Sequence, residues 1–373
     1  MPRNRTVHLF AQSTRIAAVT SSYSVPAGIA PVVRRFGPLL LRLGAGVTVL
    51  WFLGRELGAA PFEDGLRAVT WPGVAAAVTL TALTTLCSAW RWQVVARALG
   101  TDISLRRATG AYYRSLFLNS VLPGGILGDV HRAVTQGRRG GDVAQGVRAV
   151  GWERLCGQVI QAVVTVVVLL TLPSPVRPAL PWVLAGIAGV VVGAVLVVSV
   201  AARLGRSRPA RAAQALATDL RRGLLVRGVW PQLTLASGLV IAGHTATFVI
   251  AARLAGCTAP LGELIALLMV VQIAAAFPLN IGGWGPREGA AAWAFAAAGL
   301  GAASGVTVST LYAVLMLIAV TPGLGLLVAD AVRRRQGREH PAEPVPRLRP
   351  PERQPDRYPE RRPAWRAAER LVP

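Results

Sequence analysis

The chain has 373 residues, of which 53% are hydrophobic and only 15% are charged. A soluble domain carries about 25% charged residues, so this composition excludes an ordinary soluble protein. The net charge of +23 would indicate nucleic-acid binding in a soluble protein, but the arginines here lie mainly in the tails and between apolar segments. The positive-inside rule explains that distribution better. We therefore expect a membrane protein without a nucleic-acid partner.

Both ends of the chain are basic. Residues 1–36 contain no acidic residue and no apolar core with a cleavage site, and we expect a disordered cytoplasmic tail there rather than a signal peptide. Residues 333–373 alternate arginine with proline and acidic residues, a composition that buries too little apolar surface to fold. The segment between them, residues 37–332, is the expected transmembrane domain.

Long runs of valine, alanine and leucine inside residues 37–332 approach the roughly 20 residues that span a bilayer. The sequence predicts an all-α polytopic protein with six full spans. Because the tails and the loops between alternate spans are basic, we expect both termini in the cytoplasm and the chain in the inner membrane. The six expected spans are Leu39–Leu57, Pro72–Val95, Val150–Leu172, Leu180–Ala202, Pro231–Ala255 and Val306–Ala329.

Glycine and proline interrupt the apolar pattern first at Asn119–Asp129. Such a stretch disfavours a continuous helix, because proline lacks a donor and glycine adds backbone freedom. Both flanks are basic, so we expect Ser115–Ile126 to enter the membrane from the cytoplasm and return to it. Within a membrane, non-helical backbone is tolerated only beside protein or a water-filled cavity. The candidate hinge residues are Pro123, Gly124, Gly125 and Gly128.

A second interruption of the same kind lies at Phe277–Glu288. Its flanks, Leu264–Phe277 and Gly289–Leu300, are short for full spans, which favours two half-helices entering from the outer side; two short full spans remain the alternative. Two such segments of opposite entry side are typical of inverted repeats with a substrate site between them. The candidate hinge residues are Gly282, Gly283, Gly285 and Pro286, and Pro286 suits the first turn of a helix.

Ionisable residues at span depth are costly and call for a functional hypothesis. Asp129 and Arg132 share a helix face, whereas the adjacent Glu153 and Arg154 point to different partners, Arg132 being one candidate for Glu153. Arg287 and Glu288 follow the second interruption, where an anionic head group would meet helix N-terminal donors. Each of these pairs has a structural alternative, namely helix capping, dipole compensation or interfacial anchoring.

Two further polar residues receive mainly structural interpretations. Arg91, beside Trp92 at the inner end of the second span, is interpreted as a head-group anchor. His244, inside the fifth span, is interpreted as a neutral group hydrogen-bonded to a neighbour. The three cysteines have no metal-ligand spacing. Because no catalytic triad, paired carboxylates or phosphate loop is evident, we expect no enzymatic chemistry, metal or cofactor.

These residues give the chain a resemblance to the flippase-like domain family, which includes the membrane portion of lysylphosphatidylglycerol synthases. The resemblance covers about residues 38–330 and rests on Arg91-Trp92, Leu122–Arg132, Glu153–Leu155 and Ile281–Glu288. It implies that the chain moves, or helps move, an anionic or modified lipid between leaflets. Full-length synthases append a soluble aminoacyl-transfer domain, whereas a Pro/Arg-rich tail follows here, so we expect that this chain does not itself make lysyl-lipid.

The leading hypothesis from sequence is therefore an inner-membrane translocase for an anionic phospholipid or a lipid-linked glycan. The alternative is a non-catalytic scaffold that presents lipid to a separate glycosyl- or aminoacyl-transferase. In the first case Arg132 and Arg287 would contact phosphate. The candidate substrate-binding residues are Asn119, Asp129, Arg132, Glu153, Arg154, Arg287 and Glu288.

Overall fold

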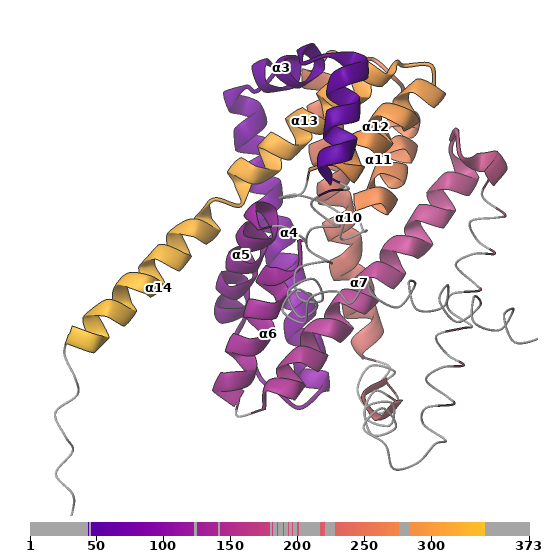
Figure 1. Ribbon diagram of the computed structural model, residues 1–373. Helices are drawn as coiled ribbons and strands as arrows, with labels where there is room; N and C mark the ends of the chain where they lie inside the picture. Colours follow the sequence, from indigo (N-terminus) through magenta and orange to yellow (C-terminus); the bar gives the residue numbers. More distant parts are fainter. Residues whose placement is uncertain are drawn as a thin grey trace, which may run out of the picture. The chain divides into compact units, whose positions relative to one another are not determined.

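In the part of the chain that the computed structural model describes, every extended secondary-structure element is a helix (Figure 1). The structure describes residue 44, residues 46–122, 125–140, 142–179, 217–220, 228–275 and 284–339, and single helical positions between 181 and 200. Residues 1–329 form one compact unit and residues 330–373 form a second, and both interrupted segments lie within the first unit. The expected all-α class is confirmed for these described residues.

Four helical segments are long and apolar enough to cross a bilayer. They are α4 (Trp71–Ala98), α7 (Val143–Thr171), α10 (Val229–Leu254) and the segment Ala302–Arg333, which contains α13 (Ala302–Ala319) and the first part of α14 (Pro322–Glu339). These confirm four of the six expected spans. Of the other two, residues 46–57 are helical, but much of Leu39–Leu57 and of Leu180–Ala202 lies outside the described residues, so six full spans remain a prediction.

Local sequence explains where the two longest single helices begin. Thr70 precedes α4 and its hydroxyl accepts a hydrogen bond from the Gly73 amide at 3.3 Å, with Pro72 in the first turn. Asp142 caps α7 in the same way, accepting from the Gln145 amide at 3.1 Å. Because of this cap α7 begins at Val143, earlier in the chain than the expected span at Val150.

Each interrupted segment separates two shorter helices that pack against one another. The first lies between α5 (Leu105–Val121) and α6 (Leu127–Gly140), and the second between α11 (Leu261–Ala275) and α12 (Pro286–Ala297). Two short elements, α3 (Ala60–Arg67) and the 3-10 helix η1 (Arg177–Ala179), complete the described fold. The breaks are confirmed, whereas the side from which each pair enters the membrane remains a prediction.

Half of the expected hinge residues can be placed. Pro123, Gly124, Gly282 and Gly283 lie outside the described residues. Gly125 and Gly285 have positive φ angles of 62° and 117°, a conformation that side chains disfavour. Gly128 and Pro286 instead belong to the first turns of α6 and α12. The expectation that Pro286 begins a helix is therefore confirmed.

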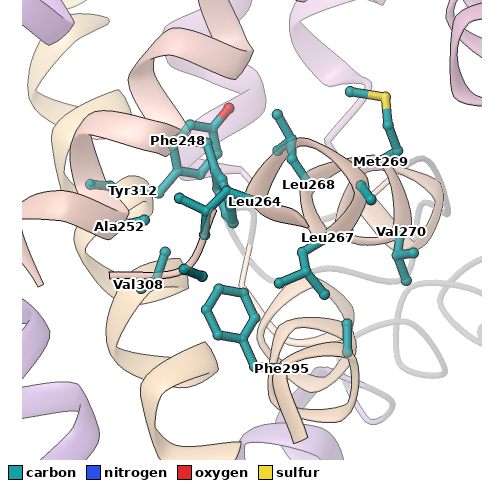
Figure 2. Close-up of a cluster of buried hydrophobic side chains, with 14 of the residues drawn as sticks. Phe248, Ala252, Leu264, Leu267, Leu268, Met269, Val270, Phe295, Val308 and Tyr312 are labelled. Atoms are coloured by element: carbon teal, nitrogen blue, oxygen red, sulfur yellow. The ribbon is translucent and has the colours of Figure 1, made fainter. Parts of the chain in front are cut away.

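The largest apolar cluster holds α11 and α12 against α10 and α13 (Figure 2). Phe248 lies at its centre, with ring centroids 5.7 Å from Tyr312 and 6.4 Å from Phe295, both in edge-to-face arrangement. Leu264 and Leu267 of α11 are completely buried in the same cluster. Between helices surrounded by lipid such contacts stabilise through close packing, because lipid is as apolar as the side chains.

Small residues let several helices approach closely. A Cβ at Gly305 of α13 would lie 2.3 Å from the Ala291 carbonyl oxygen of α12, and one at Gly128 of α6 would lie 2.1 Å from the Ser115 carbonyl oxygen of α5. Neither position has room for a side chain, which is the usual reason for small residues between membrane helices. Close backbone contact thus joins α5 to α6 within the first short-helix pair, and joins α12 of the second pair to α13.

The substitution Gly305→Ala should destabilise the protein by about 1–3 kcal/mol, because the added methyl group overpacks a backbone contact. Gly238→Ala in α10 is the matched control, since a Cβ there meets no atom within 4 Å. Alanine gains about 1 kcal/mol of helix propensity in both variants, so the control should melt at or above the wild-type temperature. Thermal unfolding in detergent measures the difference, and equal melting of the two variants would contradict this packing.

Candidate functional site

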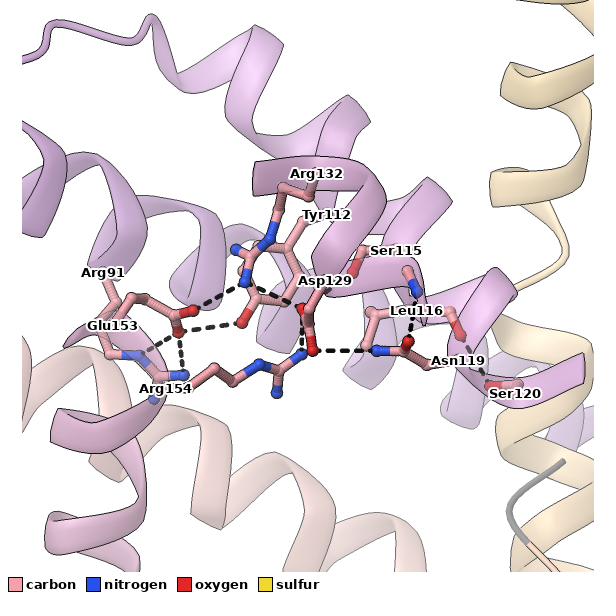
Figure 3. A network of polar contacts seen from close by, with 11 residues as sticks. Arg91, Tyr112, Ser115, Leu116, Asn119, Ser120, Asp129, Arg132, Glu153 and Arg154 are labelled. Atoms are coloured by element: carbon pink, nitrogen blue, oxygen red, sulfur yellow. Dashed lines mark hydrogen bonds and ion pairs between the residues drawn. The ribbon is translucent and has the colours of Figure 1, made fainter. Parts of the chain in front are cut away.

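A chain of five charged side chains connects α4, α6 and α7 (Figure 3). Arg91 comes from α4, Asp129 and Arg132 from α6, and Glu153 and Arg154 from α7. Arginines and carboxylates alternate along it, so three positive groups face two negative ones. The network therefore carries one positive charge in excess.

Glu153 lies at the centre of the network and its side chain is 0% exposed. Its Oε1 accepts from Arg91 Nε at 2.9 Å and from the Tyr112 hydroxyl at 3.0 Å, while its Oε2 accepts from Arg132 Nη2 at 2.9 Å. This confirms the expected Glu153–Arg132 pair. A buried carboxylate requires such pairing, because its lost hydration costs several kcal/mol.

Asp129 joins the second half of the network. Its carboxylate accepts hydrogen bonds from Ser115 Oγ at 3.0 Å and Asn119 Nδ2 at 3.2 Å, and forms ion pairs with Arg132 at 3.1 Å and Arg154 at 2.8 Å. Two guanidinium groups thus lie against one carboxylate, and both stabilise its charged form.

Asn119 links the two helices of the first pair. Its side-chain oxygen accepts from the Gly128 amide at 2.8 Å, at the start of α6, while its amide group donates to Asp129. The Asn119 side chain thus supplies an acceptor for a backbone amide in the first turn of α6 and a donor for a carboxylate in the same turn. In this structure Asn119 positions Asp129 and the start of α6.

Arg132 is enclosed by aromatic rings. Its Cζ lies 4.6 Å from the ring centroid of Trp92 and 4.2 Å from that of Tyr112, and its side chain is 0% exposed. The rings stabilise the guanidinium by cation–π attraction. This attraction compensates in part for its Nε and Nη1, two buried atoms that have no hydrogen-bond partner among the described residues. In this conformation Arg132 is a structural centre that no external phosphate reaches.

The interpretation of Arg91 as a head-group anchor is wrong. The residue is only 6% exposed, and besides Glu153 its Nη1 donates to Ser237 Oγ of α10 at 3.0 Å. Gly157 of α7 makes room for it, because a Cβ there would lie 2.8 Å from Arg91 Nη1. An apolar helix with arginine and tryptophan near its end is compatible with either role, so the sequence alone did not reveal this partner.

Three participants were missed in the sequence: Tyr112, Ser115 and Ser237. Tyr112, Ser115 and Asn119 stand at i, i+3 and i+7 on α5, so they share one helix face. That spacing was a usable signal for a polar face directed at α6. Ser237 is a single serine in an apolar span and gave no comparable signal.

The second interrupted segment builds a smaller polar cluster at the start of α12. Glu288 accepts from the Gly285 amide at 2.7 Å and from Arg287 Nη2 at 2.7 Å, and Ser309 of α13 donates to it at 3.3 Å. Arg287 Cζ also lies 5.8 Å from the ring centroid of Tyr312. Glu288 thus caps the helix, whereas the structural alternative considered for it was compensation of the helix dipole.

A cavity of about 240 Å³ lies between α4, α7, α10 and α11. Arg91 and Arg154 line it, so the first network borders the cavity directly. His244 lines it from α10 and shares a hydrogen bond of 3.1 Å between its Nδ1 and the Tyr312 hydroxyl, as expected for a partnered histidine. Through Tyr312 the cavity wall also contacts Arg287.

Chemically, this arrangement can hold an anion. Arg91 and Arg154 are cationic, and no acidic residue is among the described residues that line the cavity. The described part of the chain also contains no group of three or more His, Cys, Asp or Glu residues that could hold a metal ion. The side chain of Arg154 is 40% exposed, so it is the arginine of the network best placed to meet a ligand.

Comparison with known families identifies a match over most of the chain. The family model described as lysylphosphatidylglycerol synthase TM region covers residues 39–323. The match includes the whole network, the second polar cluster and every helix that lines the cavity. No curated protein matches the chain.

The substitution Glu153→Gln should destabilise the protein by about 3–5 kcal/mol, because it leaves Arg91 and Arg132 without their shared counter-ion. Glu63→Gln provides the control: Glu63 pairs with Arg67 at 3.1 Å, but both side chains are more than half exposed, at 55% and 75%. An exposed pair contributes at most about 1 kcal/mol. Denaturant or thermal unfolding in detergent compares the two, and similar losses in both variants would contradict the central role of Glu153.

Proposed function

The chain belongs to the lysylphosphatidylglycerol synthase TM region family, and we propose that it translocates an anionic phospholipid or a lipid-linked glycan between membrane leaflets. As a multi-pass membrane protein of this family it is tied to lipid handling. The observation that carries the proposal is the cavity bordered by Arg91 and Arg154 among three candidate spans. A polar cavity at such a place is expensive in a protein that only needs to be anchored.

Arg154 is the proposed phosphate contact. It lies on the cavity wall, its side chain is 40% exposed, and its Nη2 donates to Asp129 at 2.8 Å. A guanidinium group can bind phosphate through two parallel hydrogen bonds. Arg91 lines the same cavity. Asp129 and Glu153 then act as positioning residues, because they hold the arginines without neutralising the whole network.

Helix α7 presents two faces that match the two parts of a lipid. Arg154, Gly157, Gln158 and Gln161 face the cavity. Leu155, Val159 and Val163, on another face, are exposed by 46–59%. A head group in the cavity would therefore leave its chains beside apolar side chains. This pairing supports a lipid rather than a small soluble anion as the cargo.

The proposed topology keeps six spans with both termini in the cytoplasm, with α5–α6 and α11–α12 as re-entrant pairs of opposite entry side. Their lengths, 17 and 14 residues for the first and 15 and 12 for the second, support it, because full spans need about 20 residues. Arg287 would serve the lipid from the second pair. It contacts Tyr312, the partner of the cavity residue His244.

Replacing Arg154 by Gln should slow translocation of a fluorescent anionic phospholipid in reconstituted vesicles about tenfold or more, because one charged hydrogen bond to phosphate is lost. The control is Arg97→Gln, which removes a positive charge from an exposed pair with Asp102, where both side chains are more than half exposed. Leaflet exchange is followed by chemical quenching of the outer label.

Equal rates for wild type and Arg154→Gln would contradict the phosphate role of Arg154. Translocation that occurs only when a separate transferase is added, and that tolerates both substitutions, would instead favour the scaffold function. Arg154→Lys retains the charge and should keep part of the rate, which separates loss of charge from loss of folding.

A further inference from the structure

The cavity wall carries neutral polar side chains in addition to its arginines. Gln158 and Gln161 come from α7, Gln272 from α11, and Ser237 and His244 from α10. Three carboxamides and a hydroxyl around one space of about 240 Å³ are unusual on helices of such apolar sequence. The charge network accounts for Ser237, through Arg91, but for none of the glutamines.

Two of the three glutamines on the cavity wall have unused hydrogen-bonding capacity. The third, Gln161, donates to Thr165 at 3.2 Å and contacts Met269 Sδ at 3.5 Å. Gln158 and Gln272 have no hydrogen bond to any described residue, although both line the cavity. A carboxamide offers two donors and two acceptor sites, so each of these side chains could donate a hydrogen bond to a ligand hydroxyl group or accept one from it.

The charge pattern around the cavity disfavours one class of head group. An ammonium group requires a carboxylate or comparable acceptor in a space of low dielectric constant. None of the described lining residues is acidic, and Asp129 and Glu153 lie behind the arginines that they bind. An ammonium-bearing head group would therefore meet Arg91 and Arg154 without compensation.

From these observations we propose that the cavity selects a phosphodiester head group that carries hydroxyl groups, with the phosphate at Arg154 and Arg91 and the hydroxyls at Gln158 and Gln272. The inference rests on the proposed lipid function and names the substrate class for it. Glycosylated or polyol phospholipids have this chemistry, whereas ethanolamine phospholipids do not. Soluble sugar phosphates share it, so the test includes one.

Binding to the purified full-length protein tests the selection separately from transport. The probes are phosphatidylinositol and phosphatidylmethanol, which have the same net charge but differ in head-group hydroxyls, and native mass spectrometry in detergent reports their binding. Wild type should prefer phosphatidylinositol about tenfold, the effect of one or two hydrogen bonds. The double variant Gln158→Leu/Gln272→Leu should lose that preference and bind phosphatidylmethanol as before.

Gln232→Leu is the matched control, because Gln232 is exposed at the start of α10 and does not line the cavity. A wild type that binds both lipids equally, or a double variant that keeps the preference, would overturn the selection. Displacement of phosphatidylinositol by an equal concentration of inositol 1-phosphate would overturn its assignment to a lipid. Selective binding without any translocation would overturn the proposed function and retain this inference.

Adding a carboxylate to the cavity wall should weaken the selection against ammonium-bearing head groups. Gln272→Glu places an acceptor for ammonium on the cavity wall, so binding of phosphatidylethanolamine relative to phosphatidylinositol should rise about tenfold or more. Gln232→Glu, outside the cavity, should leave the ratio unchanged. An unchanged ratio in Gln272→Glu would overturn the placement of the head group in this cavity.

Discussion

Glu153 carries a carboxylate whose side chain is completely shielded, on a helix long enough to cross a membrane. Such a charge persists only when cations and donors surround it, and here α4, α5 and α6 each supply one: Arg91, Tyr112 and Arg132. The arrangement of these helices around α7 is therefore constrained by one residue. Because the network contains one more arginine than carboxylates, satisfying Glu153 leaves one positive charge uncompensated. Two of the network's three arginines, Arg91 and Arg154, line the cavity.

The same constraint divides the charged residues into two kinds. Arg132 is sealed between Trp92 and Tyr112 and serves the fold, whereas Arg154, which directly follows Glu153 in the chain, reaches the cavity. Asp129 keeps Arg154 in place without enclosing it. At the second interrupted segment Glu288 caps α12 and orients Arg287 against Tyr312, which in turn binds His244 on the cavity wall. The carboxylates Asp129 and Glu288 thus hold in place the arginines that are the candidate ligand contacts, Arg154 and Arg287.

Sequence patterns were sufficient where one strong physical rule acts. Apolar length predicted α4, α7, α10 and the segment Ala302–Arg333, and glycine with proline predicted both helix breaks. The free-energy cost of a charged side chain inside a membrane drew attention to Glu153, Arg154, Asp129 and Arg132. The Glu153–Arg132 pair was expected from the sequence and is present. Arg91 was misinterpreted because its partner lies on another helix, and no local pattern specifies that contact. The glutamines of the cavity were missed because single neutral polar residues in apolar helices have no spacing rule that reveals convergence from α7 and α11.

The most direct test of a head-group site in the cavity is an experimental structure of the protein in lipid nanodiscs that contain phosphatidylinositol. We predict head-group density in the cavity between α4, α7, α10 and α11, with the phosphate against Arg154 and Arg91 and with Arg132 still enclosed by its two rings. Lipid density confined to the outer surface of the helices, with the cavity holding only water, would contradict this prediction.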